Sequence, residues 1–296
     1  TFAQAGELTV GGTARMEYQS TTTETAALGN SSADTFAQNG TVVFSGTGEM
    51  DNGHTVSYMQ ALAGGSLTSQ SVAVDMGDMG TVSMASLNMA GIGTIQDMVP
   101  NGGEQPWDDL ELTKDTHGIP QVGLASPHAG NRLGYKVEAG GAIISAAANY
   151  QFAAATTSVA VQMPNLVEGF NIGAGMATDQ ESETVENDIE TVFLTYTMGA
   201  VSVGVQSTSI DHQTASSDIQ RDSYGISFAV NDNFSIGYGA SDVEFDALTK
   251  DEESRGIGAT YTMGGMKIGF INNQKDNVAG GTSNMEMNEL QLTFAF

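Results

Sequence analysis

The sequence predicts an all-β protein, a 16-stranded antiparallel transmembrane β-barrel with a long third loop folded into its lumen. Three observations predict this fold. The last segment, 288–296, alternates strictly between apolar and polar residues and ends on an aromatic residue. Similar segments recur along the chain, separated by turns that alternate between short and long. No apolar run approaches the roughly 18 residues that a transmembrane helix needs.

The final segment has one apolar and one polar face. Leu290, Leu292, Phe294 and Phe296 share one face, and Glu289, Gln291, Thr293 and Ala295 share the other. A bare strand edge of this kind promotes aggregation in a soluble domain. A barrel removes the edge by pairing the last strand with the first, so we expect 288–296 to pair with 7–18.

Composition supports a β-rich chain and restricts its partners. There are 37 glycines, 5 prolines and no cysteine, which is typical of strands joined by turns. The net charge of −26, from 35 acidic against 9 basic residues, argues against nucleic acid as a partner. Two interpretations of this charge stay open: solubility in a salty setting, or an interaction with cations, either as a preference for cations or as divalent ions that bridge acidic loops.

The N-terminus carries a small-x-small pattern, Ala3-Gln4-Ala5, ahead of the first strand. This pattern resembles the end of a secretory signal peptide, so residues 1–6 are interpreted as a signal remnant or a flexible leader. Residues 7–296 are then expected to form a single barrel domain.

Sixteen segments carry the strand pattern, and they are expected in pairs joined by tight turns. The expected strands are 7–18, 40–50, 53–63, 70–77, 79–85, 131–139, 142–151, 156–163, 168–178, 188–198, 200–210, 219–230, 233–244, 253–263, 265–274 and 284–296. Polar loops are expected at 19–39, 179–187, 211–218, 245–252 and 275–283. An even number of strands places both termini on the rim with the short turns.

Segment 86–130 breaks the strand rhythm and is rich in glycine and proline. A structureless loop of this length inside a compact domain is improbable unless it has a function. Because strands bracket it on both sides and the strand count places it on the long-loop rim, it is predicted to fold into the lumen as a constriction loop. The alternative is a solvated acidic surface loop.

The positions of the basic residues indicate which strand face points into the lumen and which points towards lipid. Arg15, Arg132, Lys136, Arg221 and Lys267 all fall on the polar face of their strands. A charge at the lipid midplane costs about 2–4 kcal/mol, so these side chains are expected to point into a water-filled lumen. The same parity would also suit a solvated face of a soluble sandwich.

No catalytic constellation is present, so an enzyme is not expected. The candidate site is instead the acidic loop, whose pore-facing residues are predicted to be Asp97, Glu104, Asp108, Asp109 and Glu111. Opposite the wall bases they would create a transverse field that selects polar solutes. No cofactor is required, although Asp108, Asp109 and Glu111 could supply oxygen ligands to Ca²⁺.

Three stretches resemble general bacterial porins, in particular the 16-stranded porins of purple photosynthetic bacteria. They are Gly6–Arg15 at the start, Gly77–Val82 ahead of the acidic loop, and Leu292–Phe296 at the end. The resemblance implies a homotrimer, a third loop that narrows the pore, and a Phe296 recognised by the barrel-assembly machinery. The small number of basic residues departs from the family, which usually carries a richer basic cluster at the constriction.

The expected function is passive diffusion of small hydrophilic solutes and ions across the outer membrane, with a preference for cations. The expected surroundings are the lipid bilayer, lipopolysaccharide and two further copies of the chain, with no nucleic acid. Alternatives are a substrate-selective outer-membrane channel and a secreted, Ca²⁺-binding acidic β-protein or adhesin. The adhesin predicts a short fixed repeat, which the sequence lacks.

Overall fold

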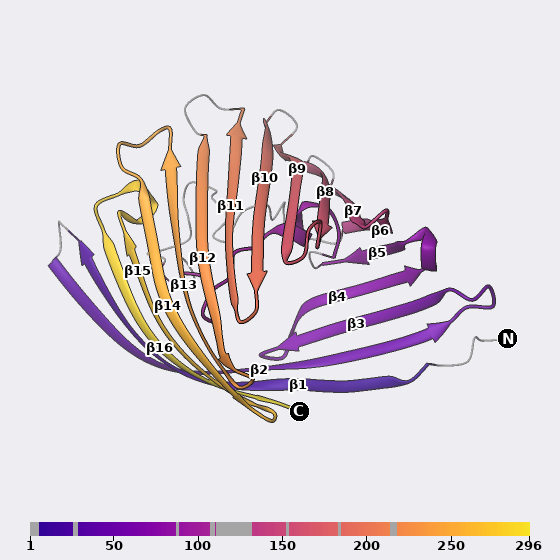
Figure 1. Cartoon of the computed structure of the whole chain (residues 1–296), viewed down its shortest axis with the longest axis horizontal. Coiled ribbons are helices and arrows are strands. Elements are labelled where there is room, and N and C mark those ends of the chain that lie inside the picture. The colour runs from indigo at the N-terminus through magenta and orange to yellow at the C-terminus, as the bar shows by residue number, and fades with distance from the viewer. Residues whose placement is uncertain are drawn as a thin grey trace.

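The protein is a closed antiparallel barrel (Figure 1). The computed structural model describes residues 6–25, 29–86, 89–106, 110, 132–151, 154–182, 185–213 and 218–296. Each of the 16 strands pairs with its neighbours in the sequence, and β16 pairs with β1. The prediction of an all-β, 16-stranded antiparallel barrel is therefore confirmed. In Figure 1, β1–β4 cross the direction of β9–β12 because tilted strands wrap around the barrel.

The strands vary from 5 to 21 residues in length. They are β1 (Leu8–Thr25), β2 (Gly29–Glu49), β3 (Thr55–Ala63), β4 (Ser66–Asp75), β5 (Thr81–Ala85), β6 (Arg132–Ala139), β7 (Ala142–Gln151), β8 (Ala154–Pro164), β9 (Phe170–Ser182), β10 (Val185–Met198), β11 (Val201–His212), β12 (Ile219–Asn231), β13 (Phe234–Phe245), β14 (Glu252–Met263), β15 (Met266–Asp276) and β16 (Asn284–Ala295). Short 3₁₀ helices occur at η1 (Gly77–Met79), η2 (Gly91–Ile95) and η3 (Val278–Gly280). None of the helices in the described ranges is long and apolar enough to cross a membrane.

The two terminal strands close the barrel. Arg15 of β1 lies opposite Thr293 of β16, and the pairing continues to Glu24 opposite Asn284. At the end of the chain the Phe296 amide donates to the Gly12 carbonyl oxygen at 2.9 Å. The predicted pairing of the last strand with the first is confirmed, and no free edge remains between them.

Two of the predicted loops are mostly strand. The loop predicted at 19–39 is wrong, because β1 and β2 stay paired as far as Thr25 opposite Gly29. The loop predicted at 179–187 is also wrong, since β9 and β10 extend through most of it. Threonine-rich segments such as 20–25 favour extended backbone. They lack the apolar alternation because these strand ends project beyond the apolar band, where both faces are polar.

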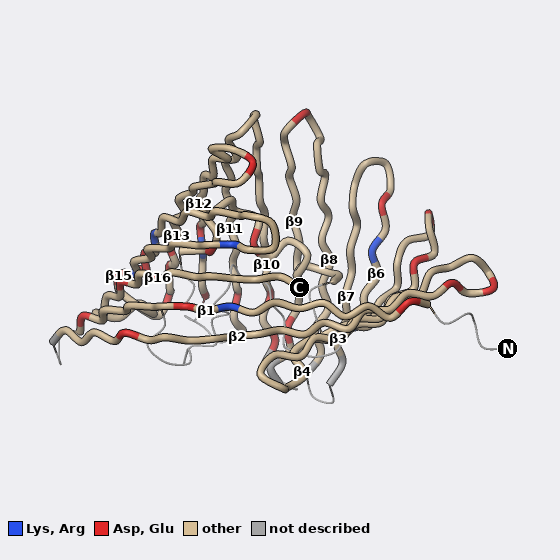
Figure 2. Tube along the Cα trace, turned by 90° about the horizontal axis from the view of Figure 1, so that it is seen from below, with Lys and Arg blue, Asp and Glu red and all other residues tan. Residues whose placement is uncertain are grey.

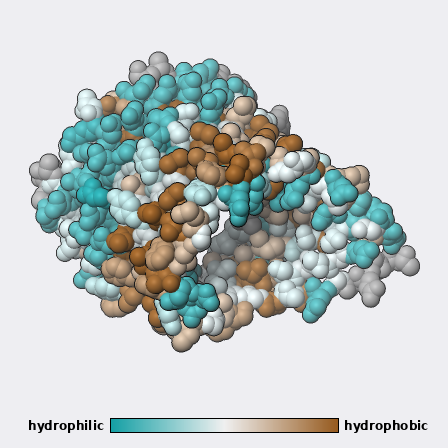
Figure 3. All heavy atoms as spheres, in the orientation of Figure 1, coloured by the Kyte–Doolittle hydropathy of each residue, from teal (hydrophilic) through white to brown (hydrophobic). Residues whose placement is uncertain are grey.

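The outer face carries an apolar band with a polar band above it. Exposed apolar side chains such as Leu194, Tyr224 and Tyr238 cover the lower and middle parts of the strands. Towards the upper rim, which carries the long loops, the same face bears Glu186 and Asp242. Figure 3 shows this change as teal residues gathered over the upper strand ends and brown residues beneath them. The apolar band has the character of a surface that faces lipid.

The inner face is less uniformly polar than the alternation predicts. Inward-facing apolar residues of β8–β13 form a buried cluster near the upper rim. Its members on the wall are Ala160, Ala177, Ile189, Phe193, Ile210, Ile219, Val243 and Phe245. The prediction of a wholly polar, water-filled interior is therefore wrong for this part of the wall. The cluster is buried because Ile92 and Ile95 of the long loop pack on it.

Candidate functional site

The described part of the long loop, 89–106, runs along the barrel wall from β6 to β16. It starts at β7 and β8, where the Gly91 amide donates to Ser145 Oγ at 2.7 Å and the Ile92 amide to Ser158 Oγ at 3.2 Å. Near its other end, Gln291 Nε2 of β16 donates to Glu104 Oε2 at 3.1 Å. The segment therefore touches strands that lie far apart around the barrel.

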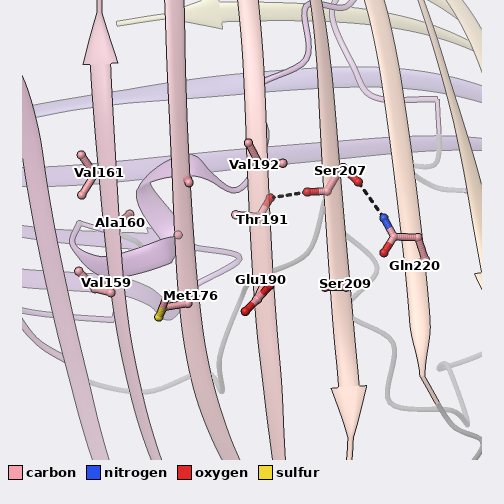
Figure 4. Close-up of a pocket in the computed structure, with 12 residues that line it drawn as sticks. Val159, Ala160, Val161, Met176, Glu190, Thr191, Val192, Ser207, Ser209 and Gln220 are labelled. Atoms are coloured by element: carbon pink, nitrogen blue, oxygen red, sulfur yellow. Dashed lines mark hydrogen bonds between the residues drawn. The ribbon is translucent and has the colours of Figure 1, made fainter.

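These contacts lie on the inner face of the wall. Ser145, Ser158 and Gln291 alternate with the exposed apolar residues of the same strands, so they point away from the outer surface. Figure 4 looks onto the outside of β8–β12, with η2 behind these strands and the opposite wall behind η2. Neighbouring strands are also tied together there, by Thr191 Oγ1 donating to the Ser207 carbonyl oxygen at 3.2 Å and Gln220 Nε2 to Ser207 Oγ at 2.7 Å.

An apolar anchor holds the beginning of the segment. The side chains of Ile92 and Ile95 are fully buried against the apolar cluster of the wall, with Met98 packed beside them. Gly175 on β9 leaves the space for both isoleucines: a Cβ at that position would lie 2.9 Å from Ile92 Cγ1 and 3.0 Å from Ile95 Cδ1. Burying each isoleucine contributes about 1.5–3 kcal/mol to holding the loop on the wall.

A single glutamine, Gln206, forms hydrogen bonds to the backbone of the next turn of the loop. Gln206 Nε2 on β11 donates to the Ile95 carbonyl oxygen at 2.8 Å and to Thr191 Oγ1 at 3.0 Å. Its Oε1 accepts from the Met98 amide at 2.9 Å. A primary amide offers both donors and an acceptor, so one buried side chain satisfies the backbone on both sides of Gln96.

The middle of the segment lies on a surface that has no side chains. Inward-facing glycines on β11–β14 form a depression, here called the glycine trough. Its members are Gly204, Gly225, Gly237, Gly239, Gly256 and Gly258. Thr260 Oγ1 donates to the Gly102 carbonyl oxygen at 3.2 Å, and Asn273 Nδ2 donates to the Gln105 carbonyl oxygen at 3.2 Å. These bonds hold the loop backbone against the trough.

A second apolar anchor follows on the far side. Leu110 is fully buried in a cluster with Ile271, Met285 and Met287 of β15 and β16. The loop is thus fixed at η2 and again at Leu110. Both anchors use apolar inward-facing residues, which the prediction of a polar interior missed.

The predicted wall bases fall into two groups. Arg15 stays partly open, with 36% of its side chain exposed, and its Nη2 lies 2.6 Å from Glu17 Oε2. Lys136 and Lys267 are exposed. Arg132 and Arg221, by contrast, are buried, with 7% and 4% exposure. Figure 2 shows the basic residues scattered singly and the acidic residues gathered towards strand ends.

Arg15 and Lys267 are brought together by register. Both lie opposite Thr293, one from β1 and one from β15, so they flank the same residue on the inner face. Gln291, two residues away on β16, holds Glu104 of the loop. The structure therefore places two predicted wall bases and one predicted loop acid around the lower part of β16.

Asp97 is the other described acid of the predicted constriction. Its side chain is exposed, although it stands inside the enclosing walls. The surrounding protein withdraws water from the carboxyl group and raises its pKa to about 6, and the positive charge of Arg221 partly opposes this rise. Asp97 thus changes its charge close to neutral pH. Asp108, Asp109 and Glu111, with the Ca²⁺ site predicted on them, lie outside the described residues.

Sequence reasoning missed the residues that position the loop. Gln206 gave no signal, because a glutamine on a polar face is ordinary. The glycines did offer one: a glycine inside a strand often marks the close approach of another backbone. Six such glycines on four consecutive strands could have suggested a seat for a chain segment.

Comparison with known proteins identifies the fold family. A family model described as Gram-negative porin matches residues 1–284. The chain belongs to the Gram-negative porin family. It is an outer-membrane protein, and family and fold point to a channel rather than an enzyme. No curated protein matches at the sequence level.

Solved porin structures resemble this porin over their whole length. A triple mutant of Rhodopseudomonas blastica porin has a TM-score of 0.69 at 15% identity, covering 98% of this chain and 100% of that one. OmpT, an outer membrane protein of Vibrio cholerae, has a TM-score of 0.66 at 12% identity, with 100% of each chain covered. At these identities the likeness supports the fold alone.

Proposed function

We propose that this porin is a passive diffusion channel for small hydrophilic solutes and ions and that it prefers cations. One observation carries the proposal. The described loop segment follows the wall from β6 to β16, whereas the inward-facing Thr13, Arg15 and Asn39 of β1 and β2 stay exposed or half-exposed. Among the described residues, the open path then lies between segment 89–106 and β1–β3. Figure 3 shows a hollow above β1–β4.

The charge on this path supports the cation preference. Asp97 and Glu104 come from the loop, and Glu17 neutralises Arg15 from the wall. The net charge of the whole chain is −26, which raises the local concentration of cations at both mouths. Arg132 and Arg221 carry positive charge but are buried, so passing ions do not contact them directly.

Planar-bilayer recording of the purified protein tests the proposal. The expected result is stepwise current increments in KCl and, under a KCl gradient, a reversal potential of the sign for a cation-selective pore. Absence of steps would refute the channel, and an anion-selective potential would refute the preference. A substrate-selective channel would instead show conductance that saturates with one solute and little conductance for KCl.

The outer surface supports contact with lipopolysaccharide through divalent cations. Exposed carboxylates face outward above the apolar band on β10, β11 and β13: Glu186, Asp188, Glu190, Asp211, Asp242 and Glu244. Phosphate groups would be repelled by these residues unless Mg²⁺ or Ca²⁺ lay between them. Removal of divalent cations by EDTA is expected to release lipopolysaccharide that co-purifies with the protein. Retention of all of it would argue against cation bridging.

We also propose that the protein assembles as a homotrimer. The outer face of β2–β4 carries Gln38, Gln60 and Gln70 where lipid-facing residues would be apolar, and Tyr58 Oη donates to Gln60 Oε1 at 2.9 Å. Such polar groups suit a protein interface better than lipid. Chemical cross-linking in membranes should give bands of dimer and trimer, and a monomer alone would refute the assembly.

Phe296 is proposed as the signal read by the barrel-assembly machinery. Its side chain is 83% exposed, and only its backbone takes part in closing the barrel. Removing the ring should therefore leave refolding in detergent intact and reduce assembly in cells. Equal levels of Phe296→Ala and wild-type protein in the outer membrane would contradict this role.

A further inference from the structure

The glycine trough is continuous across four strands. Gly204 lies opposite Gly225, Gly225 opposite Gly239, and Gly239 opposite Gly256. Gly237 and Gly258 form a second opposed pair one step further along β13 and β14. Because neighbouring strands in a sheet lie about 4.8 Å apart, the row makes a depression about 15 Å long on the inner wall.

Loop backbone packs into this depression at Gly225, Gly237 and Gly258, and the rings of Pro100 and Pro106 lie over Gly204 and Gly239. A Cβ built on Gly237 would lie 2.5 Å from the carbonyl carbon of Asn101, and one on Gly258 would lie 2.7 Å from the carbonyl oxygen of Gly102. At Gly225 the added atom would overlap the carbonyl oxygen of Pro100. Ordinary contact begins at 3.4 Å, so a single methyl group would force loop and wall apart by about 1 Å.

The contact is reciprocal at one point. Gly102 of the loop faces Gly258 of β14, and a Cβ on Gly102 would lie within 2.6 Å of the Cα, carbonyl carbon and carbonyl oxygen of Gly258. Two glycines face each other, so neither the loop nor β14 can carry a side chain at this point. Gly269 on β15 also faces inward, but its added Cβ would have only an ordinary contact, 3.7 Å from Gln291 Cβ. The close fit found in the trough is therefore absent at Gly269.

We propose that the glycine trough sets the bore of the channel by determining how far the loop stands from the wall. The inference rests on the proposed diffusion channel and deepens it. The glycines of the trough are positioning residues, because they act through the loop and touch no solute. The anchors at η2 and Leu110 hold the described part of the loop on both sides of the trough. A methyl group in the trough therefore pushes the middle of the loop towards β1–β3 and narrows the path.

Single-channel conductance in KCl provides the first test. Gly225→Ala and Gly237→Ala are expected to lower the conductance by on the order of a tenth or more, and Gly239→Ala by less, because its added Cβ would meet Pro106 Cδ at 3.1 Å. Gly269→Ala is the matched control and should conduct like wild type. Should Gly225→Ala fail to fold, Gly239→Ala carries the test. Unchanged or raised conductance in folded trough variants would overturn the proposal.

A second measurement is independent of conduction. The chain has no cysteine, so Val99→Cys introduces a unique thiol in the loop, at a buried position beside Gly225. The thiol should react slowly with a maleimide, and several-fold faster when Gly225→Ala or Gly237→Ala is added. Equal reaction rates would show that the methyl group does not lift the loop. If the wild-type protein forms no channel, the proposed function fails. The maleimide reaction rate still reports how closely the loop packs on the glycine trough.

Discussion

Gln206 Nε2 on β11 donates to the carbonyl oxygen of Ile95 at 2.8 Å, across 111 positions of the sequence. This bond, with the 2.9 Å bond from the Met98 amide to the same side chain, joins the loop to the wall beside the apolar anchor. The loop is therefore held by directional bonds as well as by buried apolar surface.

Gln206→Leu is expected to destabilise the folded protein by about 1–3 kcal/mol, because the Ile95 carbonyl and the Met98 amide lose their partner in a buried place. The loop should also move more, which raises current noise in the open channel. Urea unfolding in detergent and bilayer recording measure the two effects. Gln220→Leu, on the outer face, is the control. Equal noise in the two variants would show that Gln206 does not restrain the loop.

Cation selectivity is expected to rise between pH 5 and pH 7. The carboxyl group of Asp97 has a pKa raised to about 6, so it is mostly neutral at pH 5 and mostly negative at pH 7. Reversal potentials at pH 5, 6 and 7 measure the change. In Asp97→Asn the step near pH 6 should disappear. A step of the same size in that variant would assign the titration to another group.

The same shift affects stability with a defined sign. Because the folded state raises the pKa of Asp97 above its ordinary value of 3.8, the folded protein binds the proton more tightly than the unfolded chain. Asp97 therefore reduces stability as pH rises from about 4 to about 6. Asp97→Asn should remove this part of the pH dependence from the unfolding midpoint, and an unchanged pH profile would contradict the assignment.

Arg15→Gln is expected to increase cation selectivity, because the variant removes a partly exposed positive charge and releases Glu17, whose Oε2 lies 2.6 Å from Arg15 Nη2. Arg132→Gln provides the comparison, since Arg132 is buried. Compared with Arg15→Gln, the Arg132→Gln variant should show a smaller shift in reversal potential and a larger fall in unfolding midpoint. If Arg132→Gln shifts the potential more than Arg15→Gln, Arg15 does not belong to the constriction.

Lys275→Met should destabilise the upper rim by about 3–5 kcal/mol, because it leaves Glu252 charged and buried. Lys275 Nζ lies 3.3 Å from Glu252 Oε1, and Glu252 Oε2 accepts from the Ala279 amide at 2.8 Å. Adding Glu252→Gln should restore most of the loss, since glutamine is neutral and still accepts from that amide. Urea unfolding measures both variants. No recovery in the double variant would mean that the ion pair is not the cause.

Alternation along the chain was sufficient to predict the strands but not the extent of their upper ends. Leu290, Leu292 and Phe294 carry a period of two that an outward apolar face requires, and the structure confirms their pairing with β1. Beyond the apolar band both faces are polar, so the period vanishes. For that reason the sequence pattern predicts loops where β1 in fact extends to Thr25 and β9 to Ser182.

The candidate site was predicted only in outline. Polar parity correctly assigned Arg15 and Arg221 to the same inner face, but it could not distinguish the partly open guanidinium of Arg15 from the covered one of Arg221. The difference depends on where the loop crosses the wall. That path follows from Ile92, Gln206 and the glycine trough, which are far apart in the sequence. Of these, only the glycines inside strands carry a local signal.

The sequence by itself determined the all-β fold, the number of strands, the apolar outer face and the joining of the two termini, because each follows from residue-by-residue alternation and turn chemistry. The tertiary structure decided which inward residues meet water and which are covered by the loop. Burial of Phe193 and Arg221, and the close approach of Gly102 to Gly258, depend on long-range packing between a loop and eleven strands of wall. No local pattern encodes the distance between the loop and the wall. We infer that this distance sets the width of the channel.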